Sequence, residues 1–227
     1  MAEMKVLSFD VGTRTLSYCV LQHDDAASSL VVHAWETVDV HTEAQLSEKA
    51  KPTMKEDAEY VMNALHARKT HLWSLHPDVV IIEQQPAGGT NRFSSVRMKC
   101  LSHVIHAFFY NQQLEPTCGM HADGSRVPVT FVSPSSKLTG MPSSTSTPPT
   151  SQNDRSAMSA KYRRNKQYAV DMTALLLNNL EPGVRAQMAR TTFENARGKQ
   201  DDLSDCFMLA YAYAQKHENK SKKRKLK

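Results

Sequence analysis

Met4-Lys-Val-Leu-Ser-Phe-Asp10 is a mostly apolar run that ends on an acidic residue, which predicts a buried strand. A tight turn through Gly12 follows this strand. Apolar runs at residues 16–22 and 30–36 predict two more strands. The chain is therefore expected to begin with a meander of three short strands.

A second apolar run, Asp78-Val-Val-Ile-Ile-Glu83, predicts the clearest strand of the chain. It is apolar on both faces, as expected of a central strand that is covered on both sides. Residues 127–132 predict another strand close to a sheet edge, because Pro128 cannot donate to the ladder. This order predicts an α/β fold with a mixed central sheet flanked by helices. The expected helices lie at residues 57–75, 94–111, 160–180 and from about 201 onward.

The composition fits one globular domain, since the 227 residues are 40% apolar and 22% charged. No apolar run reaches about 18 residues, so neither a bilayer span nor a membrane partner is expected. The chain enters its first strand at once, which leaves no room for a signal or transit peptide. We therefore expect an intracellular, reducing compartment. The cysteines are widely spaced without a CxxC pair, which argues against zinc and a disulfide framework: Cys19, Cys100, Cys118 and Cys206.

Two segments differ from the rest of the chain in composition. Fifteen of the nineteen residues at 133–151 are Ser, Thr or Pro, which predicts a mobile insertion over residues 133–160. Residues 216–227 hold seven Lys or Arg and one Glu, which predicts a disordered basic tail. This tail could be a nuclear-localisation signal, a phosphate-binding arm or a solubilising end. The catalytic domain is accordingly expected to span residues 1–215.

Acidic residues occupy positions where a carboxylate needs an explanation. Asp10 could simply form the turn that follows the first strand. Glu83 ends the most apolar strand, where an ionised carboxylate is costly unless it is paired or bound to a metal. Asp201, Asp202 and Asp205 open a helix, where acids favour the helix dipole. Either Asp201 or Asp202 shares a helix face with Asp205.

Together these acids indicate a divalent-metal site. Carboxylate oxygens are the hard ligands that Mg²⁺ or Mn²⁺ prefers, and no His or Cys accompanies them. Such a cluster can hold two ions about 4 Å apart, one activating water and one stabilising the leaving oxygen of a phosphodiester. The sequence thus favours metal-dependent phosphodiester hydrolysis.

Three segments resemble the acidic motifs of a known family. They are Val6-Leu-Ser-Phe-Asp-Val-Gly-Thr-Arg-Thr-Leu-Ser-Tyr-Cys-Val20, Ile81-Ile-Glu-Gln-Gln-Pro86 and Asp201-Asp-Leu-Ser-Asp-Cys-Phe207. They occur in the order of the RuvC-type Holliday junction resolvases and are most similar to the resolvases of poxviruses, related large DNA viruses and fungal mitochondria. The resemblance runs from about residue 4 to residue 215.

The resemblance implies a ribonuclease H-like fold and paired nicking of four-way DNA junctions. It implies Mg²⁺ dependence, with Mn²⁺ as a substitute and two ions per active site. It assigns the metal ligands to Asp10, Glu83, Asp202 and Asp205, with Asp201 as a competitor of Asp202. It also implies a homodimer, because a two-fold enzyme matches a junction that is cut at two symmetric strands. The apolar faces of the helices predicted at 94–111 and 166–180 are the expected contributors to the dimer.

Basic residues add candidate DNA contacts. Lys137 lies in a segment that is similar to one carrying a DNA-contacting residue, and Lys166 resembles an active-site lysine of the family. The Ser/Thr/Pro-rich insertion between them departs from the family pattern. Each remaining candidate could equally be a solvated surface charge. These candidates are Arg14, Arg92, Arg97, Arg163 and Arg164.

Other activities fit the sequence less well. Asp10-Val-Gly-Thr13 resembles the first phosphate loop of actin-like sugar kinases, but the second Asp-Gly hairpin and the Gly-rich adenosine site are missing. A ribonuclease H-like nuclease acting on RNA–DNA hybrid, single strands or other branched DNA is the main alternative. A catalytically inactive binding module is disfavoured because all four acids are present.

Overall fold

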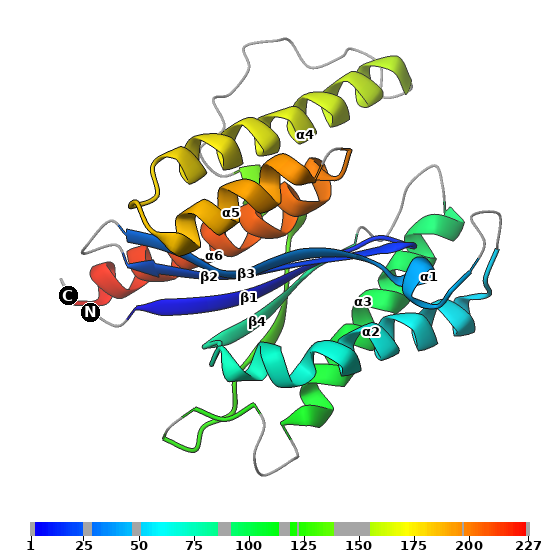
Figure 1. Ribbon diagram of the computed structural model, residues 1–227, viewed down its shortest axis with the longest axis horizontal. Coiled ribbons are helices and arrows are strands. Elements are labelled where there is room, and N and C mark those ends of the chain that lie inside the picture. Colours follow the sequence, from blue (N-terminus) through cyan, green and yellow to red (C-terminus); the bar gives the residue numbers. More distant parts are fainter. Residues whose placement is uncertain are drawn as a thin grey trace.

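A five-stranded mixed sheet forms the centre of the molecule (Figure 1). Its strand order is β3-β2-β1-β4-β5. The first three strands form an antiparallel meander, and β4 and β5 extend it in parallel with β1. The prediction of an α/β fold with a mixed sheet is confirmed. The strands are β1 (Met4–Val11), β2 (Thr15–Asp24), β3 (Ser29–Asp39), β4 (Val79–Glu83) and β5 (Val129–Val132).

The computed structural model describes most of the chain. The described residues are 3–24, 29–46, 51–85, 92–113, 119–121, 123–138, 155–196 and 198–225. Within them, the side chains of residues 24, 92–94, 138, 155–162 and 218–225 are not described.

Helices cover both faces of the sheet (Figure 1). One layer consists of α2 and α3, and the other of α4, α5 and α6. None of the helices in the described ranges has the length and apolarity needed to cross a membrane. The helices are α1 (Val40–Glu43), α2 (Met54–Ser74), α3 (Arg92–Gln112), the short 3₁₀ helix η1 (Pro134–Leu138), α4 (Arg155–Asn178), α5 (Val184–Asn195) and α6 (Gln200–Lys225).

The alternation of residues along β1 divides the core into two halves. Val6 contributes to the half beneath α4, α5 and α6, whereas Leu7 and Phe9 contribute to the half against α2 and α3. Successive side chains of a strand point to opposite faces, which explains this division. All residues of β4 are buried, as expected of a strand covered on both sides.

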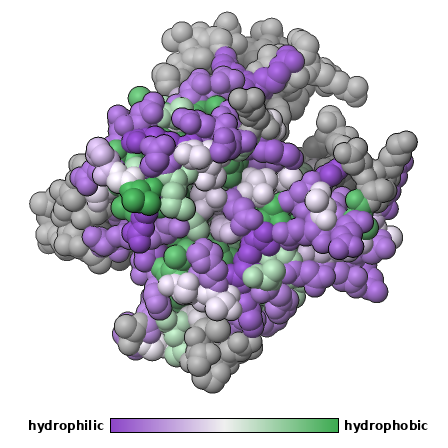
Figure 2. Space-filling view, in the orientation of Figure 1, coloured by the Kyte–Doolittle hydropathy of each residue, from purple (hydrophilic) through white to green (hydrophobic). Residues whose placement is uncertain are grey.

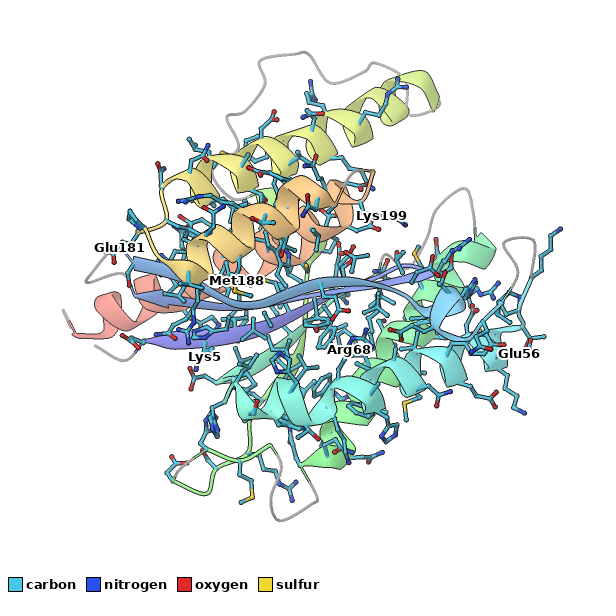
Figure 3. The ribbon with its side chains drawn as sticks, viewed as in Figure 1. Lys5, Glu56, Arg68, Glu181, Met188 and Lys199 are labelled. Atoms are coloured by element: carbon cyan, nitrogen blue, oxygen red, sulfur yellow. The ribbon has the colours of Figure 1, made fainter. Side chains whose placement is uncertain are left out.

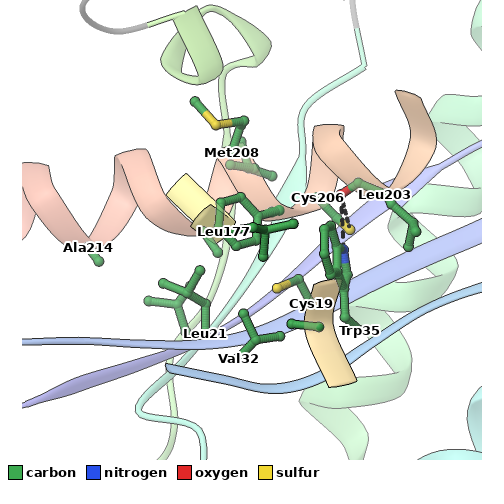
Figure 4. Packing of buried hydrophobic residues seen from close by; sticks show 14 of the residues in the cluster. Cys19, Leu21, Val32, Trp35, Leu177, Leu203, Cys206, Met208 and Ala214 are labelled. Carbon is green, nitrogen blue, oxygen red and sulfur yellow. Dashed lines mark hydrogen bonds between the residues drawn. The ribbon is translucent and has the colours of Figure 1, made fainter. Parts of the chain in front are cut away.

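Trp35 belongs to the α6 side of the core and lies beside the first turns of α6 (Figure 4). The Trp35 ring stacks on Phe193 of α5 with a centroid separation of 5.6 Å and an interplanar angle of 7°. Its indole Nε1 donates a hydrogen bond to the Leu203 carbonyl of α6 at 3.1 Å. Ser8 of β1 donates its hydroxyl to the Cys206 carbonyl at 2.7 Å. These two bonds fix the first turns of α6 over the sheet.

Regular elements lie within the segments that were predicted as an insertion and a tail. Residues 134–138 form η1 and α4 begins at Arg155, whereas residues 139–154 lie outside the described residues. The backbone of α6 continues through Lys225 and so includes residues 216–225. Lys, Arg and Glu are good helix formers, and cations favour the C-terminal end of a helix dipole. A helix already nucleated by its packed first half can therefore propagate through the basic segment.

The predicted strands and four of the helices are confirmed, but α5 was not expected. Its buried residues are Ala186, Ala189 and Phe193, whereas Val184 and Met188 are exposed. Two of the three buried residues are small, so the apolar face of this helix is hard to recognise in the sequence.

The face of the molecule in Figure 2 is mostly hydrophilic, with hydrophobic side chains in small patches.

Candidate active site

The fold brings acids from three distant segments to one end of the sheet. Asp10 lies near the carboxyl end of β1 and Glu83 is the last residue of β4. The parallel register pairs Phe9 with Ile82, so the carboxyl groups of Asp10 and Glu83 are neighbours and share a hydrogen bond. Carboxyl ends of parallel strands are a common position for functional groups in α/β folds.

Lys137 lies in the middle of this acidic cluster. Its Nζ is 2.8 Å from Glu83 Oε2, 3.3 Å from Asp205 Oδ1 and 3.8 Å from Asp10 Oδ1. The lysine belongs to η1, which follows β5, and β5 pairs with β4 so that Val132 lies opposite Glu83. Only 6% of Lys137 is exposed. The residue was predicted as a DNA contact, but in this structure it is an ion-pair partner of three acids.

The first turn of α6 separates Asp201 from Asp202. Asp202 accepts a hydrogen bond from Thr15 Oγ1 at 3.3 Å. Burial and the negative charges of Asp201 and Asp10 raise the pKa of its carboxyl group. Asp201 instead pairs with Lys166 of α4. Consecutive residues point about 100° apart on a helix, so only one of the two faces the strand ends. The structure places Asp202 on the side of Asp10.

Thr15 was missed in the sequence, although the turn before it carries a signal. Gly12 donates its backbone N–H to the Thr15 carbonyl at 2.8 Å. A Cβ atom at Gly12 would come within 2.7 Å of Thr15 Oγ1. Glycine is therefore required for the close approach that presents this hydroxyl to Asp202.

Burial and mutual charge shift the protonation of the cluster. Burial raises the pKa of Glu83 to about 9, and the hydrogen bond and charge of Asp10 act in the same direction. Burial also raises the pKa of Asp205 to about 6. For Asp10, burial is outweighed by the charge of Lys137 and the hydrogen bond with Glu83, and its pKa falls below the usual value. Burial would lower the pKa of Lys137, but the charges of its three acidic partners outweigh it and raise that pKa.

The donor set fits a divalent metal ion. Every acid in the cluster offers hard carboxylate oxygens, which suit Mg²⁺ or Mn²⁺. Three of them already converge on one cation, the ammonium group of Lys137. Among the described residues, no three His, Cys, Asp or Glu side chains are arranged to hold a metal ion as they stand. In this structure the acids surround the ammonium group of Lys137.

The remaining DNA-contact candidates lie in different settings. Arg163 and Arg164 are exposed on α4, in the same helix as Lys166. Arg14 pairs with Asp39 at 2.8 Å and is partly exposed. Arg97 does not point freely to solvent, because it pairs with the buried Asp57 and donates to the Pro52 carbonyl. The side chain of Arg92 lies outside the described residues.

Comparisons with solved structures find the same fold in known proteins. The yeast mitochondrial Holliday junction resolvase Ydc2 is similar in structure, with a TM-score of 0.57 at 17% identity over 93% of this chain and 78% of that chain. The fowlpox virus resolvase, solved with Holliday junction DNA, has a TM-score of 0.51 at 20% identity over 94% and 98% of the two chains. RuvC of T. thermophilus, also solved with a Holliday junction, has a TM-score of 0.51 at 15% identity over 93% of each chain.

The sequence itself identifies the family. No curated protein matches the chain in a sequence search. Residues 6–179 match the catalytic-domain family described as mitochondrial resolvase Ydc2 / RNA splicing MRS1. This match covers most of the chain and includes the strands that carry Asp10 and Glu83. The chain therefore belongs to the family of mitochondrial resolvase Ydc2 / RNA splicing MRS1 catalytic domains, and its fold is that of the Ydc2 and RuvC resolvase structures.

Proposed function

We propose that this chain is a Mg²⁺-dependent endonuclease that resolves four-way DNA junctions by paired nicks. The observation that carries the proposal is the convergence of Asp10, Glu83 and Asp205 on one cation position at the carboxyl ends of β1 and β4. These acids lie far apart in the sequence, at positions 10, 83 and 205, and the fold brings them together. The catalytic unit is proposed to span residues 1–215, because α6 supplies part of the acid set.

The proposed metal ligands are Asp10, Glu83, Asp202 and Asp205, for two Mg²⁺ ions that Mn²⁺ can replace. Bound metal supplies Lewis acidity at the scissile phosphate and a nucleophilic water, chemistry that the side chains alone lack. Thr15 orients Asp202 through its hydroxyl group. Lys166, held near the acids by Asp201, is placed to orient a phosphate oxygen.

Substrate binding is proposed to involve the exposed arginines of α4 and Arg14, with phosphate contacts that position the DNA. Branched DNA is favoured because the family includes a mitochondrial resolvase, and two structural neighbours were solved with Holliday junctions. The family description also names an RNA splicing protein. The complete acid set favours a nuclease over a protein that only binds RNA.

A homodimer is part of the proposal. Two symmetric strands must be cut, and a two-fold enzyme presents two equivalent sites. The predicted dimer helices carry exposed apolar residues, Val96 and Tyr110 on α3 and Leu175 on α4. Light scattering at micromolar concentration, with and without junction, should give twice the chain mass.

The compartment also remains a proposal. The family is named for a mitochondrial resolvase, which makes an organelle the first compartment to test. The basic segment at 216–227 makes the nucleus or a viral replication site the alternatives. Fluorescence localisation of the full chain, with and without neutral replacements in this segment, distinguishes them.

The function is tested by a nicking assay on a mobile four-way junction. Linear duplex, RNA–DNA hybrid and single-stranded DNA serve as competing substrates, each with Mg²⁺, with Mn²⁺ and with chelator. We expect symmetric nicks in the junction only when a divalent ion is present. Asp10→Asn, Glu83→Gln and Asp205→Asn should each abolish nicking but keep junction binding. Full activity in chelator, or preferential cleavage of hybrid or single strands, would overturn the proposal.

A further inference from the structure

Lys137 is an unusual partner for a metal site. Its ammonium group is enclosed by carboxyl groups from β1, β4 and α6, and it lies within 4 Å of all three. A buried ammonium is costly unless its charge is compensated, and the surrounding carboxyl groups provide negative charge and hydrogen-bond acceptors. The acids need the lysine in the same way, because clustered carboxylates repel each other.

A divalent ion at this cluster would draw on the same carboxyl groups. Glu83 Oε2 and Asp205 Oδ1 are the two oxygens closest to the ammonium. Mg²⁺ binds oxygen at about 2.0–2.1 Å and demands a nearly octahedral shell. An ion coordinated by these oxygens would lie close to Nζ, and two cations at such a distance repel strongly in a buried site.

We propose that Lys137 is a tethered cation that fills the metal position of the metal-free protein and must be expelled from the three carboxyl groups when a divalent ion binds. This inference rests on the proposed metal site. The lysine lies on a 3₁₀ turn that follows β5 and is not itself part of the sheet, so a change in its side-chain position requires no change in strand pairing. An expelled Lys137 is then available to a substrate phosphate next to the metal ions.

The proposal predicts that removing Lys137 has opposite effects on metal affinity and on the stability of the metal-free protein. Removing the lysine should tighten metal binding, because the ion no longer competes with the ammonium group. The same change should destabilise the metal-free protein, because the acids lose their counter-ion. A purely structural lysine would give the second effect without the first, and a lysine that helps to bind metal would weaken metal binding.

The first experiment measures Mg²⁺ and Mn²⁺ binding by isothermal titration calorimetry, without DNA. Lys137→Met should bind Mg²⁺ about tenfold or more tightly than the unaltered chain, since it removes a charge-assisted contact that the ion must otherwise break. Lys137→Arg keeps the charge and should stay within a few-fold of the unaltered affinity. Lys5→Met is the matched control: Lys5 is a partly buried lysine at the opposite end of β1 from Asp10 (Figure 3), and its Nζ donates to the Leu75 carbonyl at 2.8 Å. Its loss should leave the affinity nearly unchanged.

The second experiment uses the unaltered chain and so does not depend on how a variant folds. A pulse of acetic anhydride, followed by mass spectrometry, reports the accessibility of each lysine. Acetylation of Lys137 should be low without metal and rise several-fold at saturating Mg²⁺. Lys55, whose side chain is 84% exposed, is the internal reference and should not change.

Each result decides the proposal. Unchanged or weaker Mg²⁺ binding in folded Lys137→Met, or constant protection of Lys137 at saturating Mg²⁺, overturns the tethered-cation inference. If the unaltered chain nicks junctions with Mg²⁺ in that case, the proposed function survives. If no divalent ion binds and nicking persists in chelator, both proposals fail.

Discussion

The indole of Trp35 in β3 donates a hydrogen bond to the Leu203 carbonyl in the first turn of α6. Leu203 lies between Asp202 and Asp205, so this bond sets the rotation of the helix that carries both acids. The Ser8 hydroxyl acts one turn later by donating to the Cys206 carbonyl. The core beneath α6 therefore determines which acids face the strand ends.

Trp35→Phe should lower the free energy of unfolding by about 1–2 kcal/mol more than a ring change alone, because a buried carbonyl loses its donor. Trp73→Phe provides the matched control, since the buried Trp73 Nε1 has no hydrogen-bond partner within the described residues. Urea unfolding of both variants isolates the hydrogen bond from the loss of ring volume. Equal destabilisation of the two variants would contradict the role assigned to the Trp35–Leu203 bond.

Asp202→Asn should reduce nicking by at least about 100-fold, whereas Asp201→Asn should have a smaller effect that matches Lys166→Met. The reason is that Asp202 faces Asp10, whereas Asp201 forms an ion pair with Lys166. Single-turnover nicking of a junction at saturating Mg²⁺ measures both rates. A greater loss in Asp201→Asn would reverse the assignment.

Stability of the metal-free protein should fall as the pH rises from 6 to 9. Glu83 has a folded pKa of about 9 against an ordinary value of 4.5, so the folded chain binds this proton more tightly than the unfolded chain. A raised carboxyl pKa favours folding below the folded pKa and loses this contribution as pH rises through the window between the two values. The slope contributed by one group is at most about 1.4 kcal/mol per pH unit.

Glu83→Gln should flatten this pH dependence, because an amide does not titrate. The control is Glu59→Gln, whose exposed side chain pairs with Lys55 on the surface of α2 and should leave the slope unchanged. Urea unfolding in chelator at pH 6, 7, 8 and 9 measures all three proteins. A slope that persists in Glu83→Gln would assign the effect to another group.

Replacing Arg163 and Arg164 by alanine should weaken junction binding and make it less dependent on salt. Each lost phosphate contact reduces the slope of log K against log salt by about 0.9. The control Arg185→Ala removes an exposed charge at the start of α5. Fluorescence anisotropy with labelled junction at several salt concentrations gives the slopes. An unchanged slope in the double variant would remove α4 from the DNA interface.

Much of the site could be predicted because its acids sit at boundaries that the sequence marks. Asp10 and Glu83 end apolar runs, and the helix that begins near Asp201 has a clear apolar face. The choice between Asp201 and Asp202 could not be made from the sequence, because residues three and four positions before Asp205 both lie on its face of the helix. That choice depends on how α6 is rotated by its contacts with β1 and β3.

The position of Lys137 could not be predicted for a different reason. It follows the edge strand β5, and only the parallel pairing of Val132 with Glu83 brings its segment beside the acids. The composition of residues 133–151 predicts a mobile segment. Its first turn is nevertheless the 3₁₀ helix η1, which lies beside the acids because β5 pairs with β4. Local composition carries no information about such a long-range pairing.

The hydroxyl of Ser8 meets the Cys206 carbonyl across 198 positions of the chain, and the acids of α6 reach Asp10 across a similar span. A polypeptide still emerging from the ribosome, with α6 not yet released, therefore holds only half of the acids. Premature termination before α6 would have the same result. If these acids are the metal ligands, as proposed, the chain cannot cut nucleic acid until α6 has been synthesised, and a product truncated before α6 should be inactive.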